Sequence, residues 1–387
     1  MDEDQPRRWS ASCCRAGGAV PGRREHLVTA PSRVRWVVLE PLDTVIVRDG
    51  RAFDAGVQSQ SRTVPPTPTT MAGAIGAAYG AAPGAARSGS DSRGRDLPSH
   101  VQGPFAAYRN GDEWQGWWPV PADVITVNDD VERLSLVTPG DAEHDLSGEV
   151  ELLLDDGGQD GEPLTGWWDE QSLTEYLHDG WVSRPITGEP WQTERRVGLA
   201  REDDRTAKDS MLYSAEHLRF AHGYGLAARC LGGPAHPLAG MVNLGGRGKR
   251  AQVHEVPDIT VPEPPGDIDG GRLLLYLATP AIFPGGGWRP DLSRWPGTTL
   301  VAAALGRPQV VTTATPRRSQ GSVGDGLLMW AVPAGSVYYL QFPSEAAAAK
   351  AAESLRYEPL DQHLINDRNW LSTAGFGLVF TGRWDAP

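Results

Sequence analysis

Short apolar runs, separated by turns rich in glycine and proline, recur along the chain from residue 34 onward. Their length and their content of β-branched and aromatic residues are typical of strands. We expect strands at residues 34–39, 45–47, 251–256, 273–278, 310–313, 336–342 and 375–381, and an extended tryptophan-rich region at residues 101–125. With 46 glycines and 32 prolines, the composition favours many turns and argues against a helical bundle.

Helix signals are fewer. Residues 345–355 are rich in alanine and follow Ser344, a favourable N-cap. Residues 71–80, rich in alanine and glycine, follow a segment of prolines and threonines that suits a helix start, and a short helix is expected at residues 298–305. The second half of the chain then has the order strand, short helix, strand, strand, helix, strand, which is the order of ferredoxin-like folds and RNA recognition motifs.

These elements predict an α+β fold of two ferredoxin-like (RRM-like) domains with glycine-rich loops. The first domain is expected at residues 34–258 and the second at residues 270–387, with a proline-rich linker at residues 259–269. Residues 1–33 show no periodicity and are expected to form a disordered tail. Residues 128–163 contain twelve acidic residues and one basic residue, and are expected to be an acidic insertion in the first domain.

The net charge of −13 argues at first against a nucleic-acid partner. Most of that charge belongs to the acidic insertion, however, so arginines elsewhere can form a local positive surface. The three cysteines, with no CxxC pair, argue against a disulfide framework and a zinc site, which favours a cytoplasmic protein. No apolar run is long enough to cross a membrane, and no cofactor, metal site or catalytic motif is expected.

Several motifs occur in an ordered series that covers nearly all of the chain from residue 35. They are EPLDTVIVRDGRAF at 40–53, VPPTPTTMAGAI at 64–75, GPF at 103–105, PVPAD at 119–123, ERRVGL at 194–199, MLYSAEHLR at 211–219, LGG at 244–246, LATP at 277–280 and AVPAGSVYY at 331–339. This series resembles the Cmr subunit-three family of type III-B CRISPR effector complexes, Cas-five-like members of the RAMP superfamily. The resemblance implies a non-catalytic subunit in antiviral defence that holds the 5′ handle of the guide RNA. It also implies the large polymerase-type subunit and the backbone subunits as neighbours.

A glycine-rich loop with the sequence GGRGKR is the first candidate for RNA contact. Glycine lets a backbone approach a ligand closely, successive amides can form an anion nest, and arginine can bind phosphate through two hydrogen bonds. The candidate residues in this loop are Gly245, Gly246, Arg247, Lys249 and Arg250. A solvated turn is the alternative. A second glycine-rich loop at residues 375–377 is expected to complete a cradle with the first.

Ten further residues could contact RNA. They are Arg48, Arg51 and Phe53 in a predicted turn, Thr67, Thr69 and Thr70 at a predicted helix N-terminus, and the doublets Arg195–Arg196 and Arg317–Arg318. Each group has a structural alternative. The turn could be a hairpin in which Asp49 balances an arginine, and the threonines could only cap the helix. The two doublets could belong to a salt-bridged or merely solubilising surface.

Two other functions remain open at this stage. His217 could act as the acid or base of a metal-independent repeat-RNA endonuclease, although a structural histidine is the simpler interpretation. The 14 tryptophans could instead belong to a purely structural bridge that contacts only protein, although core packing accounts for them as well.

Overall fold

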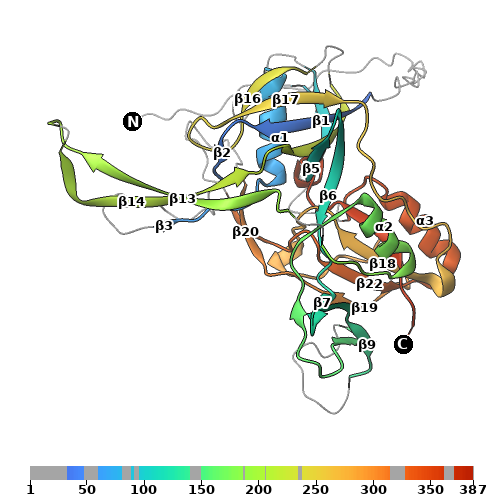
Figure 1. Cartoon of the computed structure of the whole chain (residues 1–387). Coiled ribbons are helices and arrows are strands. Elements are labelled where there is room, and N and C mark those ends of the chain that lie inside the picture. Colours follow the sequence, from blue (N-terminus) through green and yellow to red (C-terminus); the bar gives the residue numbers. More distant parts are fainter. Residues whose placement is uncertain are drawn as a thin grey trace, which may run out of the picture. The chain divides into compact units, whose positions relative to one another are not determined.

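The computed structural model describes residues 33–47, 60–80, 89–90, 96–139, 150–185, 188–204, 206–233, 238–313, 327–360 and 370–386. All of these residues belong to one compact unit, Arg33–Pro387. The predicted tail lies almost wholly outside the described residues. The fold is α+β, with mainly antiparallel sheets and few helices, as predicted (Figure 1). No helix in the described ranges is long and apolar enough to span a membrane.

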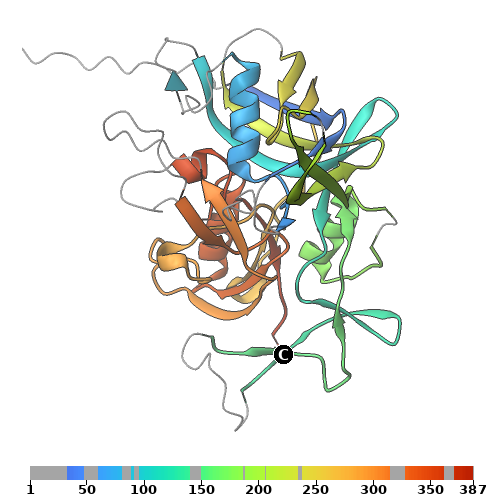
Figure 2. The ribbon, with the colours of Figure 1, turned by 90° about the vertical axis from the view of Figure 1, so that its left-hand side faces the viewer.

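We call the N-terminal part of the described chain, up to residue 256, the first half, and the part from residue 269 onward the second half. The first half contains an eight-stranded sheet in the order β12-β6-β5-β15-β1-β17-β16, with β4 paired to β5. Its strands are β1 (Val34–Pro41), β4 (Gly89–Ser90), β5 (Asp96–Asn110), β6 (Glu113–Pro119), β12 (Trp167–Asp169), β15 (Tyr224–Gly232), β16 (Gly240–Asn243) and β17 (Arg250–Val256). Helix α1 (Pro68–Ala78) packs on one face, where Met71 and Ile75 meet Val37 and Leu39 (Figure 2). The strands predicted at residues 34–39 and 251–256 are therefore confirmed.

A long two-stranded ribbon extends from this sheet. Strands β13 (Trp191–Arg201) and β14 (Ala207–Phe220) pair in antiparallel fashion. Two short strands, β2 (Thr44–Val45) and β3 (Gln60–Ser61), pair with β14, the first antiparallel and the second parallel. Strand β2 directly follows β1 along the chain, so these pairings attach the ribbon to the sheet (Figure 1).

The second half contains a four-stranded antiparallel sheet in the order β19-β22-β18-β23. Its strands are β18 (Arg272–Leu277), β19 (Thr299–Ala304), β22 (Val337–Gln341) and β23 (Val379–Arg383). Helix α3 (Glu345–Leu355) packs on one face and begins as predicted, because the Ser344 hydroxyl accepts a hydrogen bond from the amide of Ala347 at 3.2 Å. This half also contains the hairpin β20 (Gln309–Thr313) and β21 (Leu327–Ala331), helix α4 (Trp370–Thr373) and the short turns η1 (Asp269–Gly271) and η2 (Pro284–Gly286), and helix α2 (Glu170–Asp179) follows β12.

One predicted helix is wrong. In the segment 298–305, residues Thr299–Ala304 form strand β19, because their backbone groups pair with β22 and their side chains are mostly buried. Pairing with a neighbouring strand outweighs the weak helix propensity of such a short alanine-rich segment. The strand predicted at residues 310–313 does form, but it belongs to the β20–β21 hairpin and lies outside the four-stranded sheet.

The predicted acidic insertion contains short strands. They are β8 (Asp130–Arg133), β9 (Ser135–Val137), β10 (Leu153–Asp155) and β11 (Glu162–Pro163), and strand β7 (Val124–Val127) directly precedes the insertion. The amides of Glu151 and Leu152 donate hydrogen bonds to the carbonyl of Val301 at 2.9 Å. The insertion therefore packs along β19 of the second sheet.

The two halves share a hydrophobic core. Phe105 of β5 stacks on Phe380 of β23 with ring centroids 6.2 Å apart, and Trp118 packs edge-on against the same Phe380 ring. Val261, from the predicted linker, is buried in this core as well. The division into domains at residues 34–258 and 270–387 stays a prediction.

Candidate nucleic-acid interface

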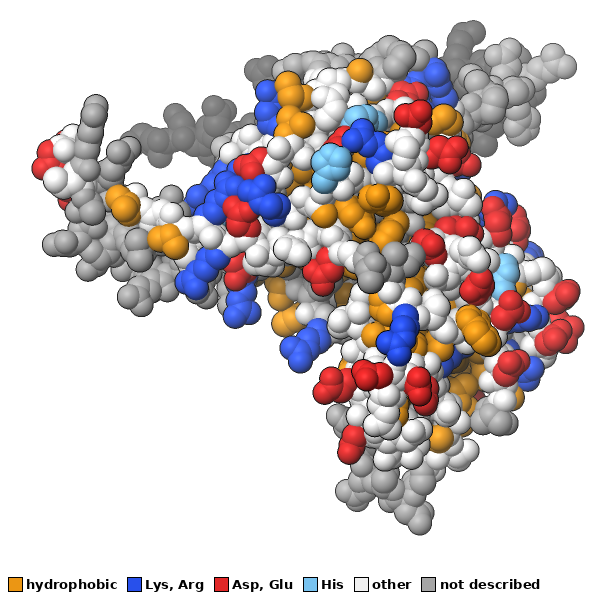
Figure 3. Space-filling model, viewed as in Figure 1, with side chains coloured by type: hydrophobic (Ala, Val, Ile, Leu, Met, Phe, Trp, Pro, Cys, Tyr) orange, Lys and Arg blue, Asp and Glu red, His pale blue; other side chains and the backbone are white. Residues whose placement is uncertain are grey.

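Basic and acidic side chains from three separate segments meet around Asp43, in the turn between β1 and β2. The Lys249 ammonium donates to Asp43 Oδ2 at 2.6 Å, and the guanidinium groups of Arg196 and Arg219 donate to Oδ1 at 3.2 and 3.4 Å. Glu194 accepts a hydrogen bond from Nε of both arginines, at 2.6 Å from Arg196. We call these five residues the Asp43 cluster. Figure 3 shows basic side chains gathered with acidic ones at the base of the β13–β14 ribbon.

Strand register explains why these residues meet. Glu194 on β13 lies opposite His217 on β14, and alternate residues of a strand point to the same face. Glu194, Arg196 and Arg219 therefore share one face of the ribbon. Arg195 points to the opposite face, where it is exposed and donates to the Ser214 hydroxyl at 3.2 Å. The predicted doublet is thus split, and only Arg196 belongs to the cluster.

The loop at residues 245–250 folds back onto the segment after β2. Gly245 has φ +75°, and a Cβ atom there would lie 2.3 Å from the carbonyl oxygen of Ile46, so only glycine fits. The amide of Gly246 donates to that same oxygen at 2.8 Å, and the amide of Lys249 donates to the carbonyl of Gly246 at 3.4 Å. Two amides of the loop are therefore bonded within the protein, the side-chain cations of the loop remain candidates for RNA contact, and the anion nest stays a prediction.

Two arginines of the same loop extend the positive charge around the cluster. Arg247 and Arg250 are exposed, whereas Lys249 is half-buried against Asp43. Arg247 itself has a positive φ of 56°. The Arg250 carbonyl accepts a hydrogen bond at 3.0 Å from the amide of Leu42, which precedes Asp43, and the charge of Arg247 acts on His217. The loop 245–250 and Arg196 of the ribbon therefore lie in one region, although they are distant in sequence.

Both carboxylates of the cluster remain ionised at neutral pH. The hydrogen bond from Lys249 and the charge of Arg196 hold the pKa of Asp43 well below its usual range. Hydrogen bonds from Arg219 and Arg196 lower the pKa of Glu194 to about 2. These carboxylates reduce the positive potential of the surrounding cations without removing it, because basic residues outnumber them in this region.

The lowered pKa of Glu194 gives a first testable prediction. A carboxyl group whose pKa is lower in the folded protein stabilises the fold above its unfolded pKa, about 4.3, and this contribution is lost as the pH falls through the folded pKa. We therefore expect the carboxyl carbon shift of Glu194, followed by NMR, to stay constant from pH 7 to pH 4. In Arg219→Gln, the titration should move up towards the ordinary range; an unchanged titration in that variant would contradict the assigned pairing.

The predicted threonine cap of α1 is only partly correct. Thr67 is the N-cap residue and Pro68 begins the helix, but the Thr67 side chain makes no capping hydrogen bond to a helix amide. Its hydroxyl lies instead 3.0 and 3.1 Å from the hydroxyls of Thr69 and Thr70. Thr67 is buried, so of the three only Thr69 and Thr70, which are half-buried, reach the surface.

The second glycine-rich loop does not form a cradle with the first. Phe376 is buried, and Gly375 packs against the backbone of Gly103 in β5. The Thr279 hydroxyl donates to the Gly375 carbonyl at 2.7 Å. This loop joins the two halves of the protein, because glycine allows close backbone contact and phenylalanine favours burial. The expectation of twin glycine hairpins facing RNA is therefore wrong.

Five predicted site residues lie outside the described residues: Arg48, Arg51, Phe53, Arg317 and Arg318. Conversely, sequence reasoning missed Asp43, Glu194 and Arg219. All three occur in motifs that carry the family resemblance, and this was the signal that could have drawn attention to them.

His217 lies beneath the cluster with only 4% of its surface exposed. Its Nδ1 atom is 2.7 Å from the Thr44 hydroxyl. Burial, and then the charges of Arg196 and Lys249, lower its pKa, so the ring is neutral at pH 7. The ring therefore supports the packing beneath the cluster and is poorly placed to exchange protons with a bound RNA. Within the described ranges, no group of three or more potential ligands could hold a metal ion.

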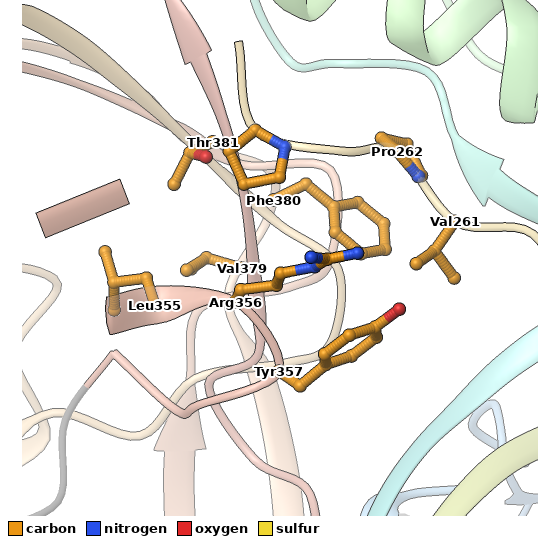
Figure 4. A pocket seen from close by; sticks show the side chains of 9 residues that line it. Val261, Pro262, Leu355, Arg356, Tyr357, Val379, Phe380 and Thr381 are labelled. Atoms are coloured by element: carbon orange, nitrogen blue, oxygen red, sulfur yellow. The ribbon is translucent and has the colours of Figure 1, made fainter. Parts of the chain in front are cut away.

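A narrow cavity lies at the join between the predicted linker and β23 (Figure 4). It is lined by Val261, Pro262, Pro264, Leu355, Arg356, Tyr357, Val379, Phe380 and Thr381. Its volume of about 10 Å³ is close to the minimum needed for a single water molecule. This cavity is therefore too small for a ligand.

Comparison with protein families identifies the chain. The model of the family described as CRISPR-associated protein (Cas_Cmr3) matches residues 37–384. The chain belongs to the Cas_Cmr3 family. The resemblance to the Cmr subunit-three family of type III-B CRISPR effector complexes is thereby confirmed.

No curated protein matches this Cas_Cmr3 protein. Among solved structures, it is similar to a chain in a cryo-EM structure of the Type III-B Cmr-beta bound to cognate target RNA, and to one in the same complex bound to cognate target RNA and AMPPnP, state 1. Each is 15% identical, with 79% of this chain and 86% of that chain covered, and the TM-scores are 0.42 and 0.41.

Proposed function

We propose that this Cas_Cmr3 protein is a non-catalytic RNA-binding subunit of a type III CRISPR ribonucleoprotein. It holds the 5′ handle of the guide RNA and bridges the large polymerase-type subunit to the backbone subunits. The observation that carries the proposal is the convergence of Arg196, Arg219 and Lys249 on one surface of an otherwise acidic chain, with Arg247 and Arg250 exposed beside them.

The arrangement suits contact with an RNA backbone rather than with one particular base. Guanidinium and ammonium groups bind phosphates through charge-assisted hydrogen bonds that do not depend on base identity. The exposed Arg195 on the other face of the ribbon extends the basic surface beyond the cluster. We infer that the ribbon and the loop together form a positively charged path along which the handle backbone lies.

The strand orders support a fold of two ferredoxin-like domains, which we propose as well. If the four main strands of each sheet are numbered by their order along the chain, their order across the sheet is 2-3-1-4, as in a ferredoxin-like fold. This order is β5-β15-β1-β17 in the first half and β19-β22-β18-β23 in the second. In the part of the chain that the structure describes, each half has a helix at one of the two positions that the ferredoxin-like order expects. Among the described residues, α1 follows the first strand in the first half, and α3, with the one-turn helix α4 behind it, follows the third strand in the second half.

Exposed aromatic residues favour a bridging role in addition. The side chain of Trp330 on β21 is 55% exposed, next to Leu328 at 60%, and Trp181 after α2 is 67% exposed. Large apolar side chains in such positions are common at protein interfaces. The endonuclease alternative has no comparable support, because its candidate residue, His217, is buried.

Salt dependence tests the proposal. Arg247→Gln combined with Arg250→Gln removes two exposed cations and leaves the five residues of the Asp43 cluster in place. We expect affinity for handle RNA to fall at least tenfold in low salt, and the slope of log K against log salt to become about 1.4 units shallower, as two lost phosphate contacts require. Fluorescence anisotropy over a salt series measures both quantities.

The matched control is Arg289→Gln combined with Arg307→Gln, which removes the same charge from two exposed loops of the second half. Its affinity and salt slope should equal those of the wild type. If the two double variants bind RNA equally well, or lose affinity equally, the assignment of the loop is wrong.

A further inference from the structure

The Asp43 cluster contains two ionised carboxylates where a simple phosphate site would have none. Both carboxylates sit directly among the cations, and both have strongly lowered pKa values. A negative charge at this position repels a phosphate, which weakens binding unless the carboxylate contacts another part of the nucleic acid. A hydrogen-bond donor on the RNA would provide that contact.

Asp43 has the geometry for such a contact. Its side chain is 45% exposed, whereas that of Glu194 is 29% exposed. Among the described residues, two donors reach Asp43 Oδ1 and one donor, Lys249, reaches Oδ2. A carboxylate can accept about four hydrogen bonds, so Oδ2 has capacity for one more donor.

The ribose hydroxyl is the donor that best fits this position. On every nucleotide the 2′-hydroxyl lies between successive phosphates, so an acceptor flanked by phosphate-binding cations meets it whatever the base. The exocyclic amines of bases also donate, but they lie at the far side of the sugar from the phosphates. An acceptor embedded among Arg196, Arg219 and Lys249 is therefore better placed for the sugar than for the base.

We propose that Asp43 distinguishes RNA from DNA by accepting a hydrogen bond from one ribose 2′-hydroxyl of the bound strand. The inference rests on the proposed RNA-binding function and adds a residue that sets specificity. Cations alone bind RNA and DNA backbones alike, whereas the 2′-hydroxyl is present only in RNA. Arg196, Arg219 and Lys249 position the carboxylate and bind the neighbouring phosphates.

A scan of 2′-deoxy substitutions tests this inference. Handle RNAs, each with one deoxynucleotide, are titrated against the full-length wild-type protein and against Asp43→Ala. In the wild type, the deoxy substitution at one position should weaken binding about tenfold, which is the size expected for the loss of a hydrogen bond to a charged group. In Asp43→Ala, the deoxy substitution at that position should have no further effect. The ratio of affinities for all-RNA and all-DNA handles should fall by the same factor.

The matched control is Asp179→Ala, which removes an exposed carboxylate that pairs at 3.0 Å with Arg383 and, among the described residues, with no residue of the cluster. This variant should keep the wild-type deoxy profile. A flat deoxy profile in the wild type would overturn the inference, and so would a deoxy effect that persists in Asp43→Ala. Neither result affects the proposed function, which fails only if the Arg247 and Arg250 variant retains wild-type binding.

Discussion

Asp123→Ala is expected to lower the free energy of unfolding by about 3–5 kcal/mol, because it leaves the half-buried Arg133 guanidinium without its counter-ion and two tyrosine hydroxyls without their acceptor. Asp123 is completely buried, and its carboxylate accepts a hydrogen bond from Arg133 Nε at 2.8 Å. The Tyr176 hydroxyl also donates to it, at 2.7 Å, and so does the Tyr339 hydroxyl. The Arg133 guanidinium lies against both tyrosine rings, with centroid distances of 4.6 and 5.4 Å. Denaturant unfolding followed by circular dichroism measures the loss.

The effect is large because this network joins three parts of the chain. Asp123 precedes β7, Arg133 ends β8, Tyr176 lies on α2 and Tyr339 lies on β22 of the second sheet. The single base of the acidic insertion therefore points inward and attaches the insertion to the rest of the protein. Asp179→Ala, which breaks the exposed pair with Arg383, is the control and should cost less than about 1 kcal/mol. Equal losses in the two variants would show that the buried pair contributes no more than a surface one.

The sequence predicted best those elements whose signals are local. Helix α3 begins after Ser344 and runs over residues 345–355, as its N-cap and alanine content indicate. Strand β1 extends the predicted apolar run by two residues. Residues 298–305 were interpreted incorrectly because their conformation depends on pairing with β22, and no local pattern reveals that partner.

The candidate site was predictable by residue type but not by arrangement. Charge and glycine content pointed to residues 245–250 and to Arg196. The register between β13 and β14 determines that Arg196 joins the cluster and that Arg195 does not. The part played by Asp43 depends on a turn that brings it to Lys249, 206 residues away in the sequence. Such contacts come from tertiary structure, so spacing along the chain could not predict them.

The two glycine-rich loops show the same limit. Residues 245–250 and residues 375–377 both read as flexible hairpins in sequence. In the structure the first is exposed, whereas the second packs against Gly103 in the other half of the protein. The two loops differ in what surrounds them, because only the second is packed against the backbone of β5. A substitution at Gly375 is therefore expected to affect stability.

Gly375→Ala is expected to destabilise the protein by about 3 kcal/mol or more. A Cβ atom at this position would lie 2.4 Å from the carbonyl oxygen of Gly103 and 2.5 Å from that of Val101. Backbone atoms cannot move aside as a flexible side chain can, so the two halves would have to separate locally, at the cost typical of overpacking. The φ of +103° adds strain for any residue other than glycine. Thermal and denaturant unfolding measure the change.

Gly240→Ala separates the two contributions. Gly240 has a similar φ of +96°, but among the described residues nothing lies within 4 Å of a Cβ atom there. This variant carries the backbone strain without the clash and should cost only about 1 kcal/mol. A loss at Gly375 no larger than that at Gly240 would mean that the loop can move away from β5. If close backbone contact at Gly375 holds the two halves together, Gly375→Ala should lower the free energy of unfolding more than Gly240→Ala does. The substitution at Gly375 would then open the shared core around Phe105 and Phe380.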